Sequence, residues 1–401
     1  MTLTDFPCGT VKIPPSKSLS HRAAICLSLA GGDPEEIENL GRSDDLAATL
    51  SGISAIVKSD GRGGTIDCGE SGSTLRFLVP VAAMFGGEWS FTGRGRLLER
   101  PQDVYEKLFR DRGALYVRER DRILVSGPLP AGRYELEGGV SSQFVSGLLF
   151  ALPLTGGDCE IALISPLESA AYVSLTLDVL RVFGVFSEEI PGADGRPAGW
   201  RIPAGAGYRK RPYRVEGDWS QAAFFLCAGA LGADVAVSGL NMDSSQGDRR
   251  ITKILERMGA VFSFEDGVFR VRPGQDGLRG TEIDARDIPD IVPPLAALAC
   301  LAEGTTLFTG AGRLRFKESD RLSALAKELS SLGADISERP DGLSVRGNRK
   351  LRGGDVSANG DHRIAMALAV ASLGCEKPVR LDGGESAGKS YPEFWKDWGK
   401  L

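Results

Sequence analysis

Six stretches of the chain share one pattern of polar and hydrophobic positions. Each opens with small, polar or charged residues, continues as an almost wholly apolar run, and stops at glycine. The six are residues 16–31, 70–87, 140–157, 217–232, 288–304 and 359–374. A polar opening is typical of a helix N-cap, and a terminal glycine is typical of a C-cap. Because a helix that is apolar on all sides must be buried, only its N-terminal end should meet solvent.

A second class of predicted helix lies between these stretches. Its members have apolar side chains at helical spacing and a polar outer face, and they are residues 100–114, 170–185, 247–260 and 318–334. Paired strands follow, with hairpin turns such as Asp266-Gly267 and Asp341-Gly342 between two alternating runs. The pattern predicts an α/β protein in which one unit of buried helix, strand, amphipathic helix and paired strands is repeated six times.

The repeats fall into two groups of three. A segment rich in glycine, proline and arginine, residues 192–214, precedes the fourth repeat and indicates a boundary near Val215. If Pro14-Pro15 marks a second crossing, the strand at residues 10–13 belongs to the C-terminal half. We therefore expect one lobe of residues 15–215 and another of residues 1–14 and 216–401. Two connecting segments would form a hinge, which suits lobes that close on a substrate.

Composition and charge narrow the class of protein. The formal net charge of −5 gives no reason to expect a nucleic acid or an anionic membrane as partner. The seven cysteines are scattered and never form C-x-x-C, which favours buried free thiols of a cytosolic protein. Two histidines leave little room for a His-rich metal site. Residues 1–5 show no leader pattern and no apolar run reaches spanning length, so we expect a soluble, cytoplasmic protein.

Cations at the starts of the buried helices indicate the chemistry. Lys17, Arg22, Arg76 and Arg363 all lie there. The helix dipole is positive at this end, and a buried charge without a partner is costly. A single arginine would be interpreted as solvated surface. Together, these cations make sense if an anion binds at the helix ends.

Simpler interpretations stay open for several polar residues at the same helix ends. Ser141 and Ser142 are suited to plain N-caps, and Asp290 is suited to capping the helix that follows Pro289. Glu318 could pair with a neighbour in its own helix. His362 is as compatible with a helix-end donor as with a chemical participant.

A stretch in the last repeat, GGESAGKS at residues 383–390, satisfies the P-loop pattern. Pro392 follows two residues later, and no downstream βαβ unit remains to supply a magnesium-holding aspartate. We therefore reject a nucleotide-binding fold. Lys389 on this Gly/Ser-rich loop is still a candidate to bind a phosphate or carboxylate.

Nine segments stand in order along the whole chain: PSKSLSHRAA, CGESGSTLR, ERPQDVYEKL, VSSQF, EGDWSQAAFF, DIPDIVP, RFKESDRL, NGDHRIAMA and GKSYPEFW. Together they resemble the 5-enolpyruvylshikimate-3-phosphate synthase family, and R-x-K-E-S-D-R with D-H-R-x-A-M is the most specific combination. The resemblance implies two inside-out α/β barrel-like lobes, each of three repeated βαβαββ units, that close over shikimate 3-phosphate and phosphoenolpyruvate. The N-terminal lobe would mainly bind the first substrate. The C-terminal lobe would mainly bind the second and carry the catalytic carboxylates.

The resemblance also implies binding residues. For shikimate 3-phosphate they are Lys17, Ser18, Arg22, Ser141, Ser142, Gln143, Ser169, Tyr172, Asp290 and Lys317. For phosphoenolpyruvate they are Lys17, Gly72, Arg100, Gln143, Arg321, Arg363 and Lys389. The resemblance implies no metal and no cofactor. Because the sequence shows no exposed apolar helix face that would indicate a subunit interface, we expect a monomer.

The implied reaction needs proton-transfer groups and a strong anion clamp. The 5-hydroxyl of shikimate 3-phosphate attacks C2 of phosphoenolpyruvate while C3 takes a proton, and the tetrahedral intermediate then loses phosphate and a C3 proton. Asp290 is the candidate base for the hydroxyl, and Glu318 is the candidate for proton transfer at C3. Lys17 or Lys389 is the candidate to protonate the leaving phosphate.

Three positions depart from the usual pattern of the family. Glu70 and Arg313 each replace a common asparagine, and Trp219 is bulky for the G-D-x-S segment. Gly72 lacks a side chain beside the expected phosphoenolpyruvate site, so we expect room there for glyphosate.

Two other functions fit parts of the pattern. The enolpyruvyl transferase that acts on UDP-N-acetylglucosamine usually has Lys-Asn where this chain has Lys17-Ser18, and often a mobile-loop cysteine where residues 97–101 have none. A binding scaffold without activity would not need the complete set of cations and both carboxylates. The residues therefore favour the shikimate 3-phosphate reaction.

Overall fold

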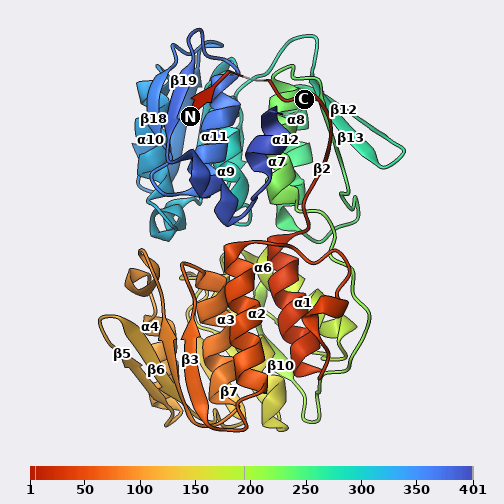
Figure 1. Cartoon of the computed structure of the whole chain (residues 1–401), viewed down its shortest axis with the longest axis vertical. Helices are drawn as coiled ribbons and strands as arrows, with labels where there is room; N and C mark the ends of the chain where they lie inside the picture. Colours follow the sequence, from red (N-terminus) through yellow and green to blue (C-terminus); the bar gives the residue numbers. More distant parts are fainter. Residues whose placement is uncertain (5, 194, 400–401) are drawn as a thin grey trace. The chain divides into compact units, whose positions relative to one another are not determined.

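The structure is a computed structural model and describes residues 1–4, 6–193 and 195–399. The chain divides into two compact units (Figure 1). The N-terminal unit is Pro15–Val215, and the C-terminal unit joins Met1–Pro14 to Glu216–Leu401. Each unit encloses a separate hydrophobic core.

Helices and, among its described residues, two sheets make up the N-terminal unit. Its helices are α1 (Lys17–Leu29), η1 (Pro34–Glu36), α2 (Asp44–Val57), α3 (Gly72–Ala83), η2 (Leu97–Glu99), α4 (Asp103–Asp111), α5 (Ser142–Ala151), η3 (Leu152–Thr155) and α6 (Ala170–Val182). One sheet has the order β3-β4-β6-β5, and its strands are Gly63–Asp67, Glu88–Thr92, Arg122–Ser126 and Leu115–Arg118. The other has the order β7-β8-β10-β9, and its strands are Gly132–Leu136, Cys159–Leu163, Pro197–Ile202 and Glu188–Pro191.

The C-terminal unit is also built from helices and sheets, with three sheets among its described residues. Its helices are α7 (Trp219–Ala230), η4 (Gly247–Arg250), α8 (Ile251–Arg257), η5 (Pro289–Ile291), α9 (Val292–Ala299), η6 (Gly312–Phe316), α10 (Arg321–Ser331), α11 (His362–Ser372), η7 (Gly384–Lys389) and α12 (Phe394–Gly399). The sheet β12-β13-β11-β2 contains Ala260–Glu265, Val268–Pro273, Val235–Ser238 and Gly9–Lys12. The sheet β14-β15-β17-β16 contains Glu282–Asp284, Gly304–Thr309, Gly342–Gly347 and Asp335–Arg339. The sheet β1-β19-β18 contains Thr2–Leu3, Val379–Asp382 and Gly354–Ser357.

One βαβαββ pattern recurs through both units. In the clearest example, β3 and β4 are parallel neighbours joined through the buried helix α3, and after α4 the hairpin β5-β6 completes the sheet. The same order holds around α5 and α9. Strand β2 from the start of the chain pairs in parallel with β11 of the C-terminal unit. The predicted fold class, lobes of repeated α/β units, is confirmed.

Local sequence signals place the ends of the buried helices. Ser16 caps α1 by accepting the backbone N–H of Leu19 at 3.4 Å. Gly31 follows the helix at φ +76°, a conformation that glycine adopts without strain. Asp218 and Asp361 cap α7 and α11 in the same way as Ser16. These caps leave the N-terminal ends of apolar helices next to polar side chains.

Three local expectations were wrong. The first repeat has no sheet among the described residues, and only an isolated bridge joins Glu38 to Arg214. The last hairpin turns at residues 340–341, because Gly342 already opens β17 and a Cβ there would lie 1.9 Å from the carbonyl oxygen of Phe308. The helix expected over residues 288–304 is shorter, since α9 spans Val292–Ala299 with its prolines confined to the first turn.

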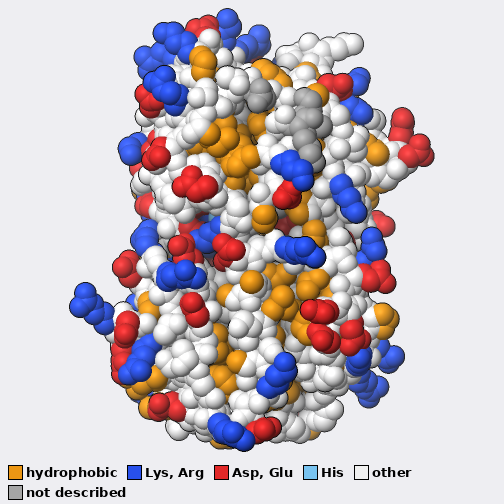
Figure 2. Space-filling view, viewed as in Figure 1, with side chains coloured by type: hydrophobic (Ala, Val, Ile, Leu, Met, Phe, Trp, Pro, Cys, Tyr) orange, Lys and Arg blue, Asp and Glu red, His pale blue; other side chains and the backbone are white. Residues whose placement is uncertain are grey.

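The surface carries both positively and negatively charged side chains. Lys and Arg side chains are interspersed with Asp and Glu over the face of each unit shown in Figure 2. All seven cysteines are free, and five of them are buried, as their scattered spacing predicted. Within the described residues, none of the helices has both the length and the hydropathy required to span a membrane.

Candidate functional site

In the N-terminal unit, polar side chains meet where α1, α2 and α3 begin. Lys17 is the first residue of α1, and its Nζ lies 2.8 Å from Asp45 Oδ2 at the start of α2. The hydroxyl of Thr74 on α3 donates to the backbone carbonyl of Asp45 at 3.2 Å. These contacts hold the N-terminal ends of the three helices together.

Arg22 is buried one turn into α1 and keeps its charge without a carboxylate among its hydrogen-bond partners. Its guanidinium donates to Thr176 Oγ1 at 2.8 Å, to the Ser18 carbonyl at 2.7 Å and to the Tyr172 carbonyl at 2.9 Å. It also lies 5.1 Å from the centroid of the Phe77 ring. Burial lowers the pKa of Arg22 to about 10, which leaves the group a cation at neutral pH. A guanidinium has five N–H donors, so two remain for an anion.

A chain of hydroxyls links α1 to the start of α3. Thr49 Oγ1 and His21 Nδ1 share a hydrogen bond of 2.7 Å, and Thr49 lies 2.6 Å from Thr74 Oγ1. Thr74 Oγ1 in turn lies 2.8 Å from Oγ of Ser71, the N-cap of α3. Burial, with a further contribution from the Lys17 charge, lowers the pKa of His21 to about 3, so its imidazole is neutral. The network therefore fixes the helix end that carries Gly72.

Arg100, Gln143 and Gly72 come together beside this helix end. A Cβ on Gly72 would lie 2.7 Å from Arg100 Nη1 and 3.5 Å from Gln143 Oε1. Gln143 Nε2 donates to Ser73 Oγ at 3.0 Å, and Arg76 donates to Gln143 Oε1 at 2.8 Å. The space beside Gly72 is thus bordered by the end of the Arg100 side chain. Room for glyphosate at this point stays a prediction.

The predicted serines lie at the starts of α5 and α6, helices that pack against each other. Ser141 caps α5 by accepting the backbone N–H of Gln143 at 3.3 Å, and its role in phosphate binding stays a prediction. Ser142 is the buried first residue of α5. Ser169 precedes α6 in the left-handed region, at φ 55°. All three are therefore close to helix N-termini, where backbone N–H groups favour an anion.

The C-terminal unit has a second buried arginine, Arg321, with a different environment. Its guanidinium donates to Asp361 at 2.8 Å, to Glu318 at 2.7 Å and to Asp290 at 3.1 Å. Burial opposes its charge, but Asp361, Glu318 and Asp290 together raise the pKa of Arg321. Burial likewise opposes the charge of Asp361, and Arg321 is the main group that holds the pKa of Asp361 below its ordinary value.

Arg363 joins the starts of α7, α9 and α11. Its Nη2 donates to Ser220 Oγ at 2.8 Å, and its Nη1 donates to the backbone carbonyls of Ser220 and Asp290, both at 3.2 Å. Its Nη2 also lies 3.7 Å from Asp290 Oδ2. Asp290 therefore faces two arginines, and its side chain caps neither η5 nor α9. The capping interpretation of Asp290 was wrong.

Lys317 and Glu318 occupy the turn before α10. Lys317 Nζ lies 4.0 Å from Asp290 Oδ1. Burial lowers the pKa of Lys317 to about 8, although the charge of Asp290 acts in the opposite direction. Glu318 lies outside α10, whose N-cap is Asp320, and it still pairs with Arg321. Lys389 is the last residue of η7, which packs against α11, and the GGESAGKS stretch forms this short helix rather than a P-loop.

The predicted residues thus form one set in each unit. The N-terminal set is Lys17, Ser18, Arg22, Gly72, Arg100, Ser141, Ser142, Gln143, Ser169 and Tyr172. The C-terminal set is Asp290, Lys317, Glu318, Arg321, Arg363 and Lys389. In the C-terminal set, hydrogen bonds or ion pairs connect Asp290, Lys317, Glu318, Arg321 and Arg363.

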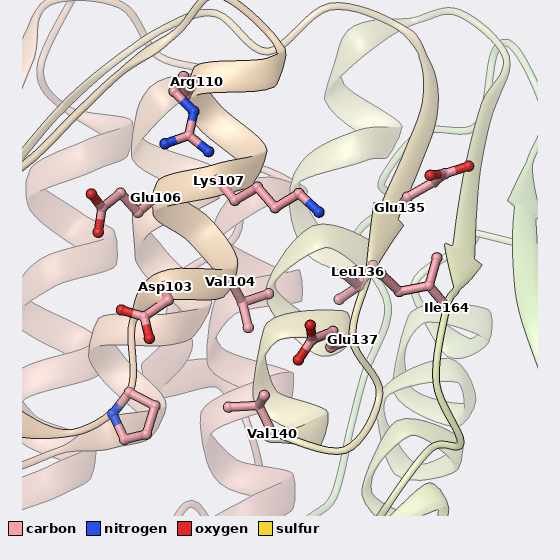
Figure 3. Close-up of a pocket in the computed structure, with 11 residues that line it drawn as sticks. Asp103, Val104, Glu106, Lys107, Arg110, Glu135, Leu136, Glu137, Val140 and Ile164 are labelled. Carbon is pink, nitrogen blue, oxygen red and sulfur yellow. The ribbon is translucent and has the colours of Figure 1, made fainter.

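A separate hollow of about 420 Å³ lies between α4 and the end of strand β7 (Figure 3). Its lining includes Val104 and Lys107 of α4 and Leu136 of β7. The charged side chains around it, such as Glu106 and Glu137, are exposed. None of its lining residues belongs to either predicted set.

Several residues that organise the two sets were not predicted. Asp45 pairs with Lys17, Asp361 pairs with Arg321, and Ser220 binds Arg363. Asp361 and Ser220 lie at starts of buried helices, so their positions in the repeat were a usable signal. Asp45 carried a weaker signal, as an acidic residue in the first turn of a helix.

The family model and the relatives that match this chain carry the same name. Residues 8–398 match the family model described as EPSP synthase (3-phosphoshikimate 1-carboxyvinyltransferase). The chain is 43% identical to the 3-phosphoshikimate 1-carboxyvinyltransferase of Clostridium beijerinckii, over 98% of this chain and 95% of that protein. It has the same identity and coverage with the protein of that name from Clostridium kluyveri.

Solved structures show the same architecture. EPSP synthase from Acinetobacter baumannii superposes with a TM-score of 0.78 and 25% identity, over 99% of this chain and 96% of that one. The enolpyruvyl transferase NikO from Streptomyces tendae superposes with a TM-score of 0.74 and 18% identity, over 100% of this chain and 96% of that one. The second likeness shows the fold alone.

Proposed function

Because this chain belongs to the EPSP synthase family, we propose that it transfers the enolpyruvyl group of phosphoenolpyruvate to the 5-hydroxyl of shikimate 3-phosphate and releases phosphate. The observation that carries this proposal is a buried arginine near buried-helix N-termini in each unit, Arg22 in one and Arg321 in the other. Both substrates carry phosphate, and both carry a carboxylate. Helix N-termini and guanidinium groups are suited to these anions.

Shikimate 3-phosphate is assigned mainly to the N-terminal set. Ser141, Ser142 and Ser169 would bind its phosphate, supported by their places at the starts of α5 and α6. Arg22 retains two N–H donors beyond its three protein contacts, which supports a role in binding the ring substituents. Ser18, Gln143 and Tyr172 would border the ring, and Lys17, Asp290 and Lys317 would complete the site.

Phosphoenolpyruvate is assigned to cations from both sets. Lys17, Arg100, Arg321, Arg363 and Lys389 supply positive charge for its phosphate and carboxylate. Gly72 and Gln143 would line the same place, supported by the 2.7 Å that would separate Arg100 Nη1 from a Cβ on Gly72. Planar guanidinium groups bind such anions through paired hydrogen bonds, which fixes the orientation of C2 toward the attacking hydroxyl.

Two carboxylates are assigned to proton transfer. Asp290 would accept the 5-hydroxyl proton as the O5–C2 bond forms, while Glu318 delivers a proton to C3. In the second step the C2–O bond to phosphate breaks, C3 returns a proton to Glu318, and Lys17 or Lys389 protonates the departing phosphate. The contacts of Asp290 and Glu318 with Arg321 support this assignment, because they hold both carboxylates in defined orientations.

The remaining properties are proposed on simpler grounds. The seven free cysteines support a reducing compartment, so we assign the protein to the cytoplasm. We expect it to act as a monomer without metal or cofactor. Transfer to UDP-N-acetylglucosamine is the second candidate reaction, and Ser18 after Lys17 argues against it.

The decisive measurement is phosphate release by the purified protein with phosphoenolpyruvate and each acceptor in turn. Release that depends on shikimate 3-phosphate is the expected result. Release only with UDP-N-acetylglucosamine would show that the proposed acceptor is wrong and that the reaction type is right. Binding of both proposed substrates without release would favour a scaffold without activity.

A further inference from the structure

A proline inside the buried helix α3 leaves one backbone carbonyl without its usual donor. In an α-helix, the carbonyl of residue i accepts the N–H of residue i+4. Pro80 occupies that place for the carbonyl of Arg76, and proline has no N–H. An unsatisfied carbonyl in a core is destabilising, so a donor from elsewhere is required.

Tyr105 supplies that donor. It is fully buried on α4, and its single hydroxyl proton points to the Arg76 carbonyl, which lies 2.7 Å from Oη, and is shared with the Phe144 carbonyl of α5 at 3.1 Å. Its ring packs edge-on against Phe144, with centroids 4.7 Å apart. One side chain of α4 thus connects α3 with α5.

Gly147 makes this junction possible. A Cβ at Gly147 would lie 2.1 Å from Tyr105 Oη and 2.2 Å from the Arg76 carbonyl oxygen. A larger residue would therefore displace the hydroxyl or separate the helices. Pro80, Gly147 and Tyr105 form one junction: Pro80 withholds the N–H, Tyr105 supplies a donor in its place, and Gly147 leaves the room that this donor requires.

The junction lies directly behind groups assigned to substrate binding. The Arg76 side chain donates to Gln143 Oε1 at 2.8 Å and to the Pro101 carbonyl at 3.2 Å. Pro101 directly follows Arg100 in the chain. Tyr105 lies four residues further on, in the first turn of α4. A shift of Tyr105 would therefore move both the Arg100 turn and Gln143.

We propose that the Tyr105 hydroxyl is a positioning group, which sets Arg100 and Gln143 for phosphoenolpyruvate by completing the hydrogen bond that Pro80 denies to the Arg76 carbonyl. Tyr105 itself does not contact substrate. This inference rests on the proposed function for its kinetic consequence, but the hydrogen bond that it invokes can be tested in the protein alone.

The test compares Tyr105→Phe with the double variant Pro80→Ala/Tyr105→Phe. The first removes only the hydroxyl, so we expect the KM for phosphoenolpyruvate to rise about tenfold while kcat changes less than about twofold. The second restores an N–H at position 80 that can donate to the Arg76 carbonyl. We expect it to recover most of the lost KM and most of the lost thermal stability. Pro80→Ala alone should stay close to the parent protein.

Tyr116→Phe is the matched control. Its hydroxyl makes no hydrogen bond among the described residues, and its ring packs against Phe109, as that of Tyr105 does. Loss of an aromatic hydroxyl in general would affect both variants equally, whereas the proposal requires that Tyr116→Phe have little effect.

The outcomes separate the two proposals. If the parent protein turns over shikimate 3-phosphate and Tyr105→Phe leaves both kinetic constants unchanged, the positioning role is wrong. A Tyr105→Phe defect that Pro80→Ala does not relieve would also overturn it. If the parent protein has no turnover, the proposed function fails, and rescue of thermal stability by Pro80→Ala still decides whether the junction exists.

Discussion

Arg22 and Arg321 are equivalent in burial and opposite in surroundings. Each side chain lies near the N-terminal ends of buried helices and is only 2% exposed, one in each unit. The hydrogen bonds of Arg22 go to a hydroxyl and two carbonyls, whereas those of Arg321 go to three carboxylates. The hydrogen-bond partners of Arg22 therefore leave its charge uncompensated. The charge of Arg321, in the same repeated architecture, is compensated by carboxylates of the protein.

The difference indicates a division of labour. A guanidinium held by neutral oxygens keeps its charge for a ligand anion. A guanidinium that binds several carboxylates instead orients them, and oriented carboxylates suit proton transfer. We therefore expect variants of Arg22 to change binding, and variants of the carboxylates around Arg321 to change stability or turnover.

The largest effect should come from Asp361→Asn. Asparagine can still cap α11, but the charge that faces buried Arg321 at 2.8 Å is lost. Removing one partner of a buried ion pair destabilises a protein by about 3–5 kcal/mol. Urea unfolding of the variant measures this loss.

Asp355→Asn provides the comparison for Asp361→Asn. Asp355 pairs with Arg380, and the two side chains are 69% and 66% exposed. An exposed pair contributes at most about 1 kcal/mol. Equal effects of the two substitutions would contradict the special dependence of Arg321 on carboxylates.

Asp290→Asn and Glu318→Gln should each lower turnover by at least about 100-fold with substrate affinity retained, because each removes a proton-transfer group. Pre-steady-state phosphate release measures the loss of turnover, and titration with shikimate 3-phosphate measures substrate affinity separately. Asp287→Asn is the control, since that side chain is 38% exposed and pairs with Arg250. Normal turnover in either test variant removes that residue from the scheme.

Arg22→Lys should act on binding instead. Lysine keeps the charge but cannot reproduce the three directed hydrogen bonds of the guanidinium, so we expect the KM for shikimate 3-phosphate to rise about 30-fold. Steady-state kinetics with each substrate varied is the measurement. Arg181→Lys on exposed α6 surface serves as control. A loss confined to kcat would show that Arg22 does not act as a binding group.

The smallest effect concerns pH and Lys317. Its pKa of about 8 means that the ammonium form declines as pH rises through that value. If shikimate 3-phosphate requires the ammonium form, its affinity at pH 9 should be about tenfold lower than at pH 7. Calorimetric titration across this range tests the loss, and Lys317→Arg should abolish it.

The same pKa also fixes the sign of a stability effect. Between pH 8 and 10.5 the unfolded chain binds the Lys317 proton and the folded chain does not. The contribution of Lys317 to stability therefore becomes more favourable as pH rises through this window. A decrease assigned to Lys317 by comparison with Lys317→Arg would contradict the lowered pKa.

Much of the fold follows from short-range signals. The caps Ser16, Asp218 and Asp361 and the terminal Gly31 act within one helical turn of their own sequence. The turn at Asp266-Gly267 joins β12 to β13 as predicted, with both residues at positive φ. Such features depend on local backbone geometry and need no knowledge of the partner segments.

The sequence by itself therefore determined the repeated α/β units, the buried helices and the cations at their starts, and its ordered motifs identified the family. Only the tertiary structure decided which groups compensate those cations. The contacts of Lys17 with Asp45, of Arg321 with Asp361 and of Arg22 with Thr176 span 28, 40 and 154 positions of the chain. The need of the Arg76 carbonyl for a donor could be read from Pro80, but that Tyr105 meets it could not. The physical reason is that burial makes every polar group require a partner, while packing alone selects which distant residue supplies it.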